Sequence, residues 1–588
     1  MVLSNKTYIS LILFVLATSV YLPSLNNRFL WDDVALIEKS SSYLNELNIE
    51  KILIPRESNK KNLKYYRPTF QISMFTDYQI WGAKAFGYHL TNVLLFSISA
   101  VIFFLLSVLI LKAFSIQGPE KYSFIGSLIF IAHPMHVESV SWIAGRTDIL
   151  CAIFMGLAFI FHILSGKRFI YILAATVSFY LSLLSKELAV VFPLIVISFD
   201  LLSGKAKRKN IVSYIFYASI LFTYLYIRSR SYINVPPVSK EITGSSNNAT
   251  GAAINYFSLI KTFASSYLFY IYKITLPFVF NAYISHVPAN LTYFISSVIS
   301  ILLISFISLV CYLKRKGIVT FAVLWIFITL GPSVMVAVLS IAAAPLAERY
   351  VFVPTMGFCL LGGYMFLLTE TGSNNYKRSS LALLITILLI FTFLTIRRQG
   401  VWQDRLSLWK DTSEKSFYDA FPHSNYGKAL QDNKQYELAI SQYMTALDPE
   451  VDDTNRGRAI TSNNLSLVYI ETGQYSKAET WLKKALEYDP SYLLTYYHLG
   501  LINYIDGEQR NSRQSYLEAE QLLLKVIKKD RKYARAKLLI AKVYSSLGEI
   551  DKAVKYAAEA RKGLNDRRLM MEADKIIKVN NKTGQDQP

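Results

Sequence analysis

The sequence is poor in cysteine. Its 588 residues include only Cys151, Cys311 and Cys359. Each lies in an apolar run, so we expect no framework of disulfides. No Gly-rich phosphate loop is apparent, so the sequence gives no reason to expect a nucleotide. The basic residues do not form a patch interleaved with aromatic residues, so we expect no nucleic-acid partner.

Acidic residues are also scarce relative to basic ones. The chain has 41 Asp and Glu residues against 62 Lys and Arg residues, a formal net charge of +21. Many basic residues stand in short loops between apolar runs, where they set membrane topology. Hydrophobic residues make up 53% of the chain and the mean hydropathy is +0.30, which soluble proteins of this length seldom reach. These features predict an all-α chain with a polytopic membrane domain over residues 1–397 and a soluble helical region after it.

A membrane-crossing helix needs about 20 apolar residues. About eleven such runs can be found, several of them short. The first run follows Lys6. We interpret it as an uncleaved span and not as a signal peptide, because its length suits a membrane crossing and no clear small-x-small cleavage site precedes the adjacent residues Asp32 and Asp33. The predicted spans are 7–25, 84–112, 122–138, 148–165, 168–185, 187–203, 211–229, 292–313, 318–340, 350–369 and 379–396.

Basic clusters orient these spans. Lys167-Arg168, 205–209, Lys314-Arg315-Lys316 and Lys377-Arg378 should face the cytoplasm, which puts the N-terminus inside. The apolar stretch at 255–280 is then predicted to be an interfacial or re-entrant helix on the outer face, although a two-helix hairpin remains possible. The region after the last span lies outside. Two arginines that follow this span, Arg397 and Arg398, argue against the scheme because they would lie outside too.

Ionisable residues gather at the span ends predicted to face outward. Snorkelling of Lys and Arg toward the headgroups explains single cases, and a capping turn would explain the adjacent Asp pair. Acids and histidines gain little from snorkelling, so the mixed set favours a polar cavity at the membrane edge. The candidate site residues are Asp32, Asp33, His133, His136, Glu138, Arg146, Asp148, Lys186, Glu187, Glu348 and Arg349.

These residue types suit the transfer of a sugar carried on a lipid phosphate. Arg146, Lys186 and Arg349 could hold a phosphate or diphosphate whose lipid tail lies between spans. An Asp of the pair could deprotonate an acceptor hydroxyl, or Asp32 and Asp33 could hold a divalent cation such as Mg²⁺ or Mn²⁺. A zinc site at His133, His136 and Glu138 is disfavoured, because the spacing is not HExxH and Pro134 disturbs the helix.

Five motifs, in this order, resemble those of the transmembrane and tetratricopeptide-repeat-containing O-mannosyltransferases and their bacterial relatives, in the GT-C superfamily. They are Phe29-Leu30-Trp31-Asp32-Asp33, His133-Pro134-Met135-His136-Val137-Glu138, Gly145-Arg146-Thr147-Asp148, Ser185-Lys186-Glu187 and Ala347-Glu348-Arg349-Tyr350-Val351-Phe352-Val353-Pro354. The resemblance implies a GT-C fold, a polyprenyl-phosphate-linked donor and a catalytic acid in the first outer loop, which maps onto Asp32 and Asp33. The repeat domain is much shorter than in animal members, so the sugar and the acceptor stay open.

The region after residue 397 contains a repeat. Residues 398–420 are predicted to form an amphipathic connector. After it, a seven-residue pattern recurs at 433–439, 472–478 and 547–553: Gly or Asn marks a turn, Tyr or Ile follows, and Ala ends the stretch. With Asp-Pro at the repeat ends, these predict about four tetratricopeptide units over 421–563, the third with an insertion at 507–515. A terminal helix and a disordered tail, from about residue 576, are expected in 564–588. Such arrays usually bind proteins; dimerisation is the alternative.

Taken together, the residues and the resemblance predict an integral-membrane glycosyltransferase. It would move a sugar from polyprenyl phosphate to hydroxyl side chains of a protein held by the repeats, on the periplasmic side of a bacterial inner membrane or on a lumenal face. Two alternatives stay open. One is a ligase or polymerase acting on a lipid or glycan. The other is a membrane scaffold or transporter without enzymatic activity, although transporters usually place their polar groups near the midplane.

Overall fold

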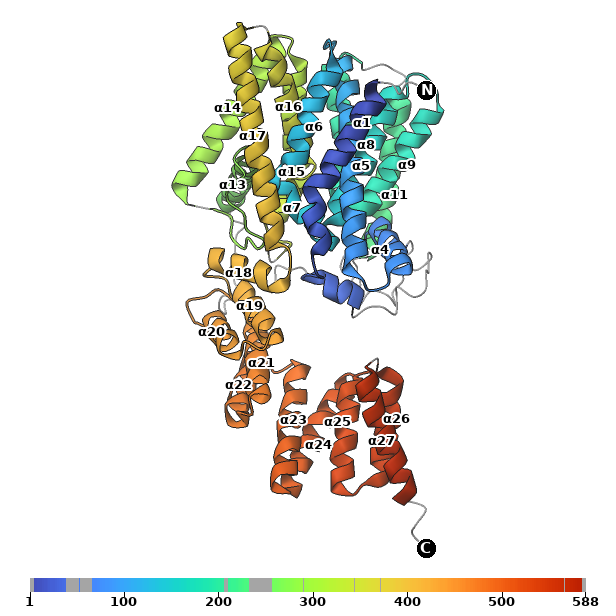
Figure 1. The fold of residues 1–588 in the computed structure, drawn as a ribbon, viewed down its shortest axis with the longest axis vertical. Helices are drawn as coiled ribbons and strands as arrows, with labels where there is room; N and C mark the ends of the chain where they lie inside the picture. Colours follow the sequence, from blue (N-terminus) through green and yellow to red (C-terminus); the bar gives the residue numbers. More distant parts are fainter. Residues whose placement is uncertain are drawn as a thin grey trace. The chain divides into compact units, whose positions relative to one another are not determined.

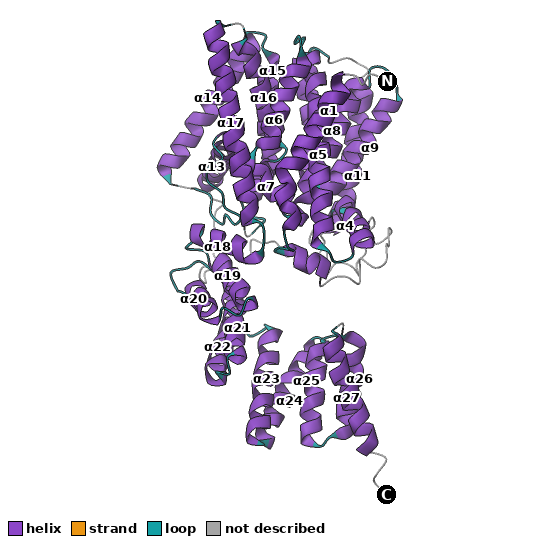
Figure 2. Cartoon of the chain, viewed as in Figure 1, coloured by secondary structure: helices purple, strands orange, loops and turns teal. Residues whose placement is uncertain are grey.

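The computed structural model describes residues 5–38, 52, 66–205, 210–231, 256–288, 290–342, 344–370, 372–564 and 566–583. The chain divides into two compact units, Met1–Lys415 and Ser416–Pro588, here called unit 1 and unit 2. The division falls inside the predicted connector at 398–420. Within the described residues the secondary structure is helical, apart from isolated bridges at Ile284–Leu346 and Asp419–Asp452 (Figure 1, Figure 2). The predicted all-α class is thus confirmed.

Unit 1 is a bundle of apolar helices joined by short polar segments. Its α-helices are α1 (Asn5–Tyr21), α4 (Pro68–Trp81), α5 (Ala85–Ala113), α6 (Pro119–Ala132), α7 (Val137–Ser141), α8 (Arg146–Leu164), α9 (Ile170–Ser185), α10 (Phe192–Leu202), α11 (Asn210–Ser231), α13 (Tyr256–Thr275), α14 (Leu291–Leu313), α15 (Gly317–Val338), α16 (Pro354–Thr369), α17 (Asn374–Val401) and α18 (Arg405–Lys415). The described residues of unit 1 also form one π-helix, η2 (Val34–Glu38), and five 3₁₀ segments: η1 (Leu22–Asn26), η4 (Pro134–His136), η5 (Ile143–Gly145), η6 (Glu187–Val191) and η7 (Glu348–Val351).

The predicted spans all contain helix, but not all of these helices are long enough to cross a bilayer alone. Within the described residues, seven helical stretches have the length and hydropathy of a membrane span, at Asn5–Asn26, Ala85–Ala113, Ile143–Leu164, Asn210–Arg230, Leu291–Leu313, Gly317–Val338 and Asn374–Val401. Helices α9 and α16 are apolar but shorter. A multi-pass membrane domain is therefore supported, while the count of eleven spans stays a prediction.

Short helices pack closely through glycine. A Cβ atom at Gly363 of α16 would come within 2.3 Å of the carbonyl oxygen of Tyr122, and one at Gly126 of α6 within 2.7 Å of that of Cys359. The two helices therefore approach backbone to backbone, as small residues allow in membrane bundles. A larger side chain at either position would push α6 and α16 apart.

Helix α13 covers the stretch predicted to lie at the interface. Its 20 residues are long enough for a span, but it lacks the hydropathy expected of one. In Figure 1 it is seen almost end-on, whereas α5 and α17 are seen from the side. Its side chains Tyr267, Tyr270 and Ile274 are buried against α15 and the segment around Leu346. This arrangement is consistent with a helix lying across the neighbouring spans.

The described residues of unit 2 form four antiparallel helix pairs and a final helix. The helices are α19 (Ala420–Asp432), α20 (Tyr436–Ala446), α21 (Asn455–Glu471), α22 (Tyr475–Tyr488), α23 (Leu493–Arg510), α24 (Arg513–Lys529), α25 (Ala534–Leu547), α26 (Ile550–Gly563) and α27 (Arg567–Thr583). Fully buried alanines at 439, 478, 519 and 553, one in the second helix of each pair, allow the close helix contacts of a tetratricopeptide solenoid.

The turns within the pairs show how the sequence specifies the repeat. Gly473 (φ 75°) and Gly548 (φ 79°) adopt the left-handed conformation that glycine tolerates best. In the first pair this conformation falls on Lys434 (φ 59°) and not on the preceding asparagine, and in the third on Asn511 (φ 52°). The predicted insertion at 507–515 is absorbed as helix, since α23 has 18 residues and α24 has 17 against 14 in each helix of the fourth pair.

The end of the chain differs from the expectation. Helix α27 continues to Thr583, past residue 576 where a disordered tail is predicted. The reason is an apolar stripe on α27, in which Leu569, Met570, Ala573 and Ile576 pack against Leu538 and Leu564. Residues 584–588 of the predicted tail lie outside the described part of the chain.

Candidate functional site

The adjacent aspartates follow α1 and η1 in a tight turn. The backbone N–H of Asp33 donates to the carbonyl of Leu30 (2.7 Å). The Asp33 carboxylate accepts the N–H of Leu30 (3.2 Å) and the N–H of Ala144 (3.1 Å). Asp33 is fully buried, whereas Asp32 is exposed. The pair is therefore split: one carboxylate ties the turn to η5, and the other is accessible.

The two environments have electrostatic consequences. Burial raises the pKa of the Asp33 carboxyl from 3.8 to about 8, while the backbone N–H groups of Leu30 and Ala144 act in the opposite direction. Asp33 is then mostly protonated at neutral pH. The Asp33 side chain accepts hydrogen bonds from backbone N–H groups, as the interpretation of the aspartate pair as a capping turn predicts.

Trp31, directly before the aspartates, joins this turn to a basic cluster. Its ring stacks on Trp142, with the ring centroids 5.3 Å apart and the planes at 21°. The guanidinium of Arg349 lies 5.2 Å from the centroid of Trp142 and 5.0 Å from that of Tyr350. The ammonium group of Lys186 lies 5.0 Å from the same Tyr350 ring. The first, fourth and fifth sequence motifs thus meet at one end of unit 1.

The cations of this cluster have carboxylate partners. Arg349 forms an ion pair with Glu138, which also accepts the Arg349 backbone N–H (2.9 Å). Lys186 forms a buried ion pair with Asp148, whose second oxygen has no hydrogen-bond partner in the structure. The pKa of Lys186 is lowered, first by burial and then by the nearby positive charges of Arg67 and Arg349, while Asp148 opposes this shift. Three cations therefore stand close enough to interact.

Glu187 adds two more arginines, Arg67 and Arg228, to the cluster. It accepts a hydrogen bond from Arg67 (2.9 Å) and lies 4.0 Å from Arg228 of α11. Arg67 and Arg228 are not among the predicted site residues. Both lie outside the short motifs, so only the fold reveals their contacts with Glu187.

Glu348 forms a separate buried network. It accepts the backbone N–H of Asn281 (2.6 Å) and pairs with Lys273 of α13 (3.3 Å) and Arg398 of α17 (3.4 Å). Arg398 also pairs with Asp411 of α18 (2.8 Å) and is only 3% exposed. Its burial in an ion-pair network removes Arg398 as an argument about topology, because a buried, paired arginine does not report on the side of the membrane.

Arg146 is placed differently from Lys186 and Arg349. It is fully buried, and each guanidinium nitrogen donates to the protein: Nε to Asn92 (2.6 Å), one terminal nitrogen to Asp77 (2.5 Å) and to the carbonyl of Tyr88 (3.0 Å), and the other to Ser73. Its hydrogen-bonding capacity is used within the protein. Asp77 and Asn92, its partners, carry no motif signal that the sequence could have shown.

The two histidines of the second motif are also engaged. The N–H at Nε2 of His133 faces the carbonyl of Ile274 (2.9 Å), and its Nδ1 accepts the N–H of Met135 (3.3 Å). Nε2 of His136 lies 2.7 Å from the hydroxyl of Thr355. Across the described residues, no group of three or more His, Cys, Asp or Glu side chains could hold a metal ion. These contacts favour the interpretation of both histidines as hydrogen-bonding groups.

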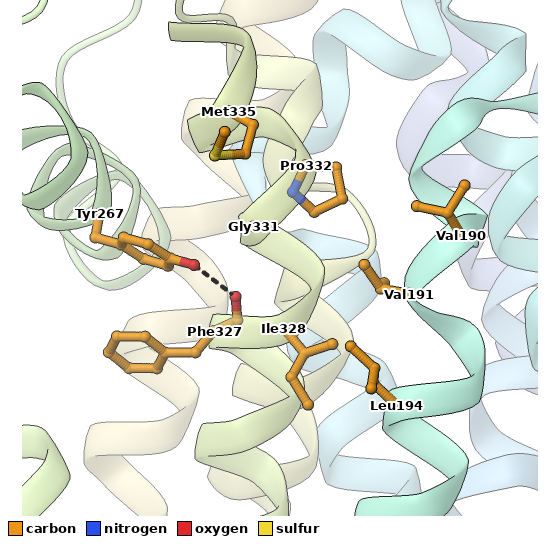
Figure 3. Close-up of a pocket in the computed structure, with 9 residues that line it drawn as sticks. All are labelled: Val190, Val191, Leu194, Tyr267, Phe327, Ile328, Gly331, Pro332 and Met335. Atoms are coloured by element: carbon orange, nitrogen blue, oxygen red, sulfur yellow. Dashed lines mark hydrogen bonds between the residues drawn. The ribbon is translucent and has the colours of Figure 1, made fainter. Parts of the chain in front are cut away.

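An apolar groove of about 520 Å³ begins one turn after Glu187 (Figure 3). It is bounded by η6 and the start of α10, by Tyr267 of α13, and by α15 around Gly331 and Pro332. Pro332 has no N–H, so α15 loses a helix hydrogen bond there, and the Tyr267 hydroxyl donates to the carbonyl of Phe327 (3.0 Å). The lining residues are Val190, Val191, Leu194, Tyr267, Phe327, Ile328, Gly331, Pro332 and Met335.

Comparison with known proteins adds two kinds of likeness. Tetratricopeptide-repeat models match residues 418–491 and 534–560, which confirms the repeats. The protein O-mannosyl-transferase F38B6.6 of Caenorhabditis elegans is 25% identical over 75% of this chain and 63% of its own length. The human protein O-mannosyl-transferase TMTC3 is 23% identical over 88% of this chain and 60% of its own length. The chain thus spans a little under two thirds of these relatives.

Solved structures resemble only part of the chain. A crystal structure of MamA covers 30% of this chain and 87% of its own, with 20% identity and a TM-score of 0.22. The crystal structure of YrrB, described as a TPR protein with an unusual peptide-binding site, covers 28% of this chain and 97% of its own, with 20% identity and a TM-score of 0.17.

Proposed function

We propose that this chain, whose homologues are multi-span, repeat-containing protein O-mannosyl-transferases of the TMTC family, is a membrane glycosyltransferase that acts on proteins. It would move a sugar from a polyprenyl-phosphate carrier to a hydroxyl side chain. One observation supports this most: an exposed aspartate stands at the same end of unit 1 as a cluster of buried and half-buried cations, joined to it through Trp31 and Trp142.

Asp32 is the general base in this proposal. The acceptor oxygen attacks the anomeric carbon, its proton passes to the Asp32 carboxylate, and the bond from that carbon to the phosphate oxygen breaks with inversion. Asp33 is not a second base, because both of its oxygens accept backbone N–H groups and its pKa of about 8 keeps it mostly protonated at neutral pH. It supports the turn that presents Asp32. The same hydrogen bonds weaken the alternative role of the pair as a cation site.

Arg349 and Lys186 are proposed to stabilise the departing phosphate. Arg349 keeps 20% of its side chain exposed while Glu138 fixes its position, so further guanidinium N–H groups can reach a ligand. Charge stabilisation by preorganised donors is usually the largest catalytic contribution of this kind. Arg146 is left out of this role since its donors are used within the protein.

The apolar groove is proposed to take the isoprenoid tail of the donor. Its first lining residue, Val190, lies in the same 3₁₀ segment that starts at Glu187, directly after Lys186. A phosphate held near Lys186 would place its lipid tail at the mouth of this groove. Branched aliphatic and aromatic side chains suit a branched hydrocarbon chain.

The repeats of unit 2 are proposed to engage the protein acceptor. The chain leaves unit 1 through α18, and both this helix and the residues before it contact the segment carrying Asp32. The Arg28 N–H donates to the carbonyl of Gln403 (2.9 Å), which precedes α18, and Trp31 meets Trp409 of α18 with ring centroids 5.2 Å apart. The last helix of unit 1 therefore lies beside the turn that carries Asp32, at the end of unit 1 that the charge pattern of the loops predicts to be periplasmic or lumenal.

The test is transfer by the purified full chain in lipid nanodiscs. Mannosyl and glucosyl esters of a polyprenyl phosphate serve as donors, exported proteins serve as acceptors, and glycopeptides are identified by mass spectrometry. We expect a hexose on Ser or Thr with the native chain and none with Asp32→Asn. The Glu370→Gln variant, which changes a carboxylate after α16 that has no role in the proposed reaction, should keep full transfer.

Other outcomes separate the alternatives. Sugar found on lipids or glycans, with proteins unmodified, would support a ligase. No transfer to either pool by a well-folded native chain, from either donor, would remove the proposed function and favour a scaffold.

A further inference from the structure

Trp31 has a backbone conformation that bulky residues rarely adopt. Its φ is 44°, in the left-handed region, and such outliers in non-glycine residues persist only when their surroundings impose them. They are enriched where function requires a strained geometry. Trp31 stands directly before Asp32, within the turn that Asp33 closes. The conformation of this one residue therefore decides where the Asp32 carboxylate points.

Two indole rings hold Trp31. Trp142 stacks on it at 5.3 Å, and Trp409 of α18 meets it edge to face at 5.2 Å with an angle of 65°. Trp142 also stacks on Trp402 at 6.3 Å. Trp402 and Trp409 are 0% and 2% exposed. Four of the seven tryptophans in the chain thus form one cluster behind Asp32.

Helix α18 is itself fixed to the bundle on the same side. Arg398 pairs with Asp411 of α18 (2.8 Å), and the Arg28 N–H donates to the carbonyl of Gln403 just before α18. Trp409 therefore has a rigid support. The side chain that holds Trp31 comes from the last helix of unit 1, far from Asp32 in sequence.

We propose that Trp409 is a positioning residue: together with Trp142 it imposes the left-handed conformation of Trp31 and so turns Asp32 outward and Asp33 inward. The proposal rests on the proposed role of Asp32 as the base only for its effect on rate. The conformational effect stands without it.

Thiol labelling tests the conformational effect without any need for activity. Asp32→Cys and Asp33→Cys are introduced separately, and labelling by a hydrophilic maleimide is followed by peptide mass spectrometry. With native Trp409, the thiol at position 32 should react at least about tenfold faster than the thiol at position 33, because reactivity follows exposure. Adding Trp409→Ala should narrow this ratio to below about threefold, whereas Trp409→Phe, which keeps an aromatic edge, should preserve it.

Trp409→Leu and Trp31→Ala extend the test in case Trp409→Ala fails to fold. The first keeps an apolar volume without a ring, and the second removes the other side of the same contact, so both should narrow the ratio. The control is Trp481→Phe in unit 2, which should leave it unchanged. An unchanged ratio in folded Trp409→Leu and Trp31→Ala variants would overturn the proposal.

Kinetics test the effect on rate. Trp409→Ala should lower kcat about 10- to 100-fold, as misplacement of a reacting group does, with the KM for the lipid donor unchanged, and Trp409→Phe should restore most of the rate. If Trp409→Ala lowered kcat/KM by the same factor only by raising the KM for the donor, with kcat unchanged, the role of Trp409 as a positioning residue would be contradicted. If the native chain transfers no sugar, the proposed function fails, and the labelling ratio still decides whether Trp409 positions Asp32.

Discussion

The two ends of the helix bundle in unit 1 differ in how deeply their charged side chains are buried. One end carries Asp32. Four charged side chains there are at most 2% exposed, and each has an oppositely charged partner: Glu138, Arg146, Asp148 and Glu348. At the other end, where α5 and α16 finish and α6 begins, the ion pairs are partly in water. Lys6 and Lys112 approach Glu120 (3.7 and 3.3 Å), and Lys121 pairs with Glu370 with the lysine 58% exposed.

Burying charge is costly, so this asymmetry has a meaning. Ion pairs in the interior often contribute little net stability, because the desolvation of both groups offsets their attraction. A bundle that needed only topology signals could keep its charges in water at both ends. The opposite end also buries a carboxylate, Asp200, and among the described residues its side-chain donors come from His162, Asn210 and Tyr214. Dense buried cations therefore mark the end with Asp32 as a candidate active site.

The largest expected effect comes from the exposed member of the aspartate pair. Asp32→Asn should lower transfer about 10²- to 10⁴-fold, the range for loss of a general base. Asp33→Asn should lower it less than about tenfold, because an amide replaces a carboxyl that is already largely neutral. Initial rates of transfer in nanodiscs measure both. The reverse order, with Asp33→Asn the more damaging, would move the base to the buried residue.

The second prediction concerns the stability that the buried ion pair between Arg349 and Glu138 gives to the end of unit 1 that carries Asp32. Arg349→Met leaves Glu138 buried without its cation and should destabilise unit 1 by about 3–5 kcal/mol. Adding Glu138→Gln removes the uncompensated charge and should recover part of this loss. Thermal unfolding in detergent, followed by intrinsic fluorescence, measures the cycle. If the single variant unfolds like the native chain, the buried pair is not energetically coupled, and the contrast between the ends is only geometric.

The third effect is a pH dependence that Asp33 confers. Its pKa is raised from 3.8 to about 8 in the folded chain, so its contribution to stability is full below about pH 4 and is lost as the pH rises through about 8. The Asp33→Asn variant lacks this loss. Its unfolding temperature relative to the native chain should therefore rise between pH 4 and 8. A constant difference above pH 5 would show an ionised Asp33 and would weaken the distinction between the two aspartates.

Local patterns in the sequence predict much of the fold. Apolar runs give the helices of unit 1, and the spacing of Tyr, Gly and Ala gives the repeats of unit 2, because both depend on neighbours in the chain. The motifs also contain Lys186 and Arg349. The sequence does not reveal that Arg146 is used up by Asp77 and Asn92, nor that Arg398 is buried, because these partners come from distant helices. Their roles follow from packing and not from composition.

The smallest expected effect is at the opposite end. Lys121→Met breaks the pair with Glu370 as Arg349→Met breaks the pair with Glu138, yet it should cost less than about 1 kcal/mol, because an exposed lysine gains little from its partner in water. Glu370 also keeps the hydroxyl of Tyr122 as a donor (2.6 Å), so it is not left without a hydrogen bond. The same thermal unfolding in detergent, at low and high salt, measures it, and the effect should shrink further with salt. A loss as large as that of Arg349→Met would show that both ends depend on their charges equally, and the buried cations would no longer distinguish the end that carries Asp32.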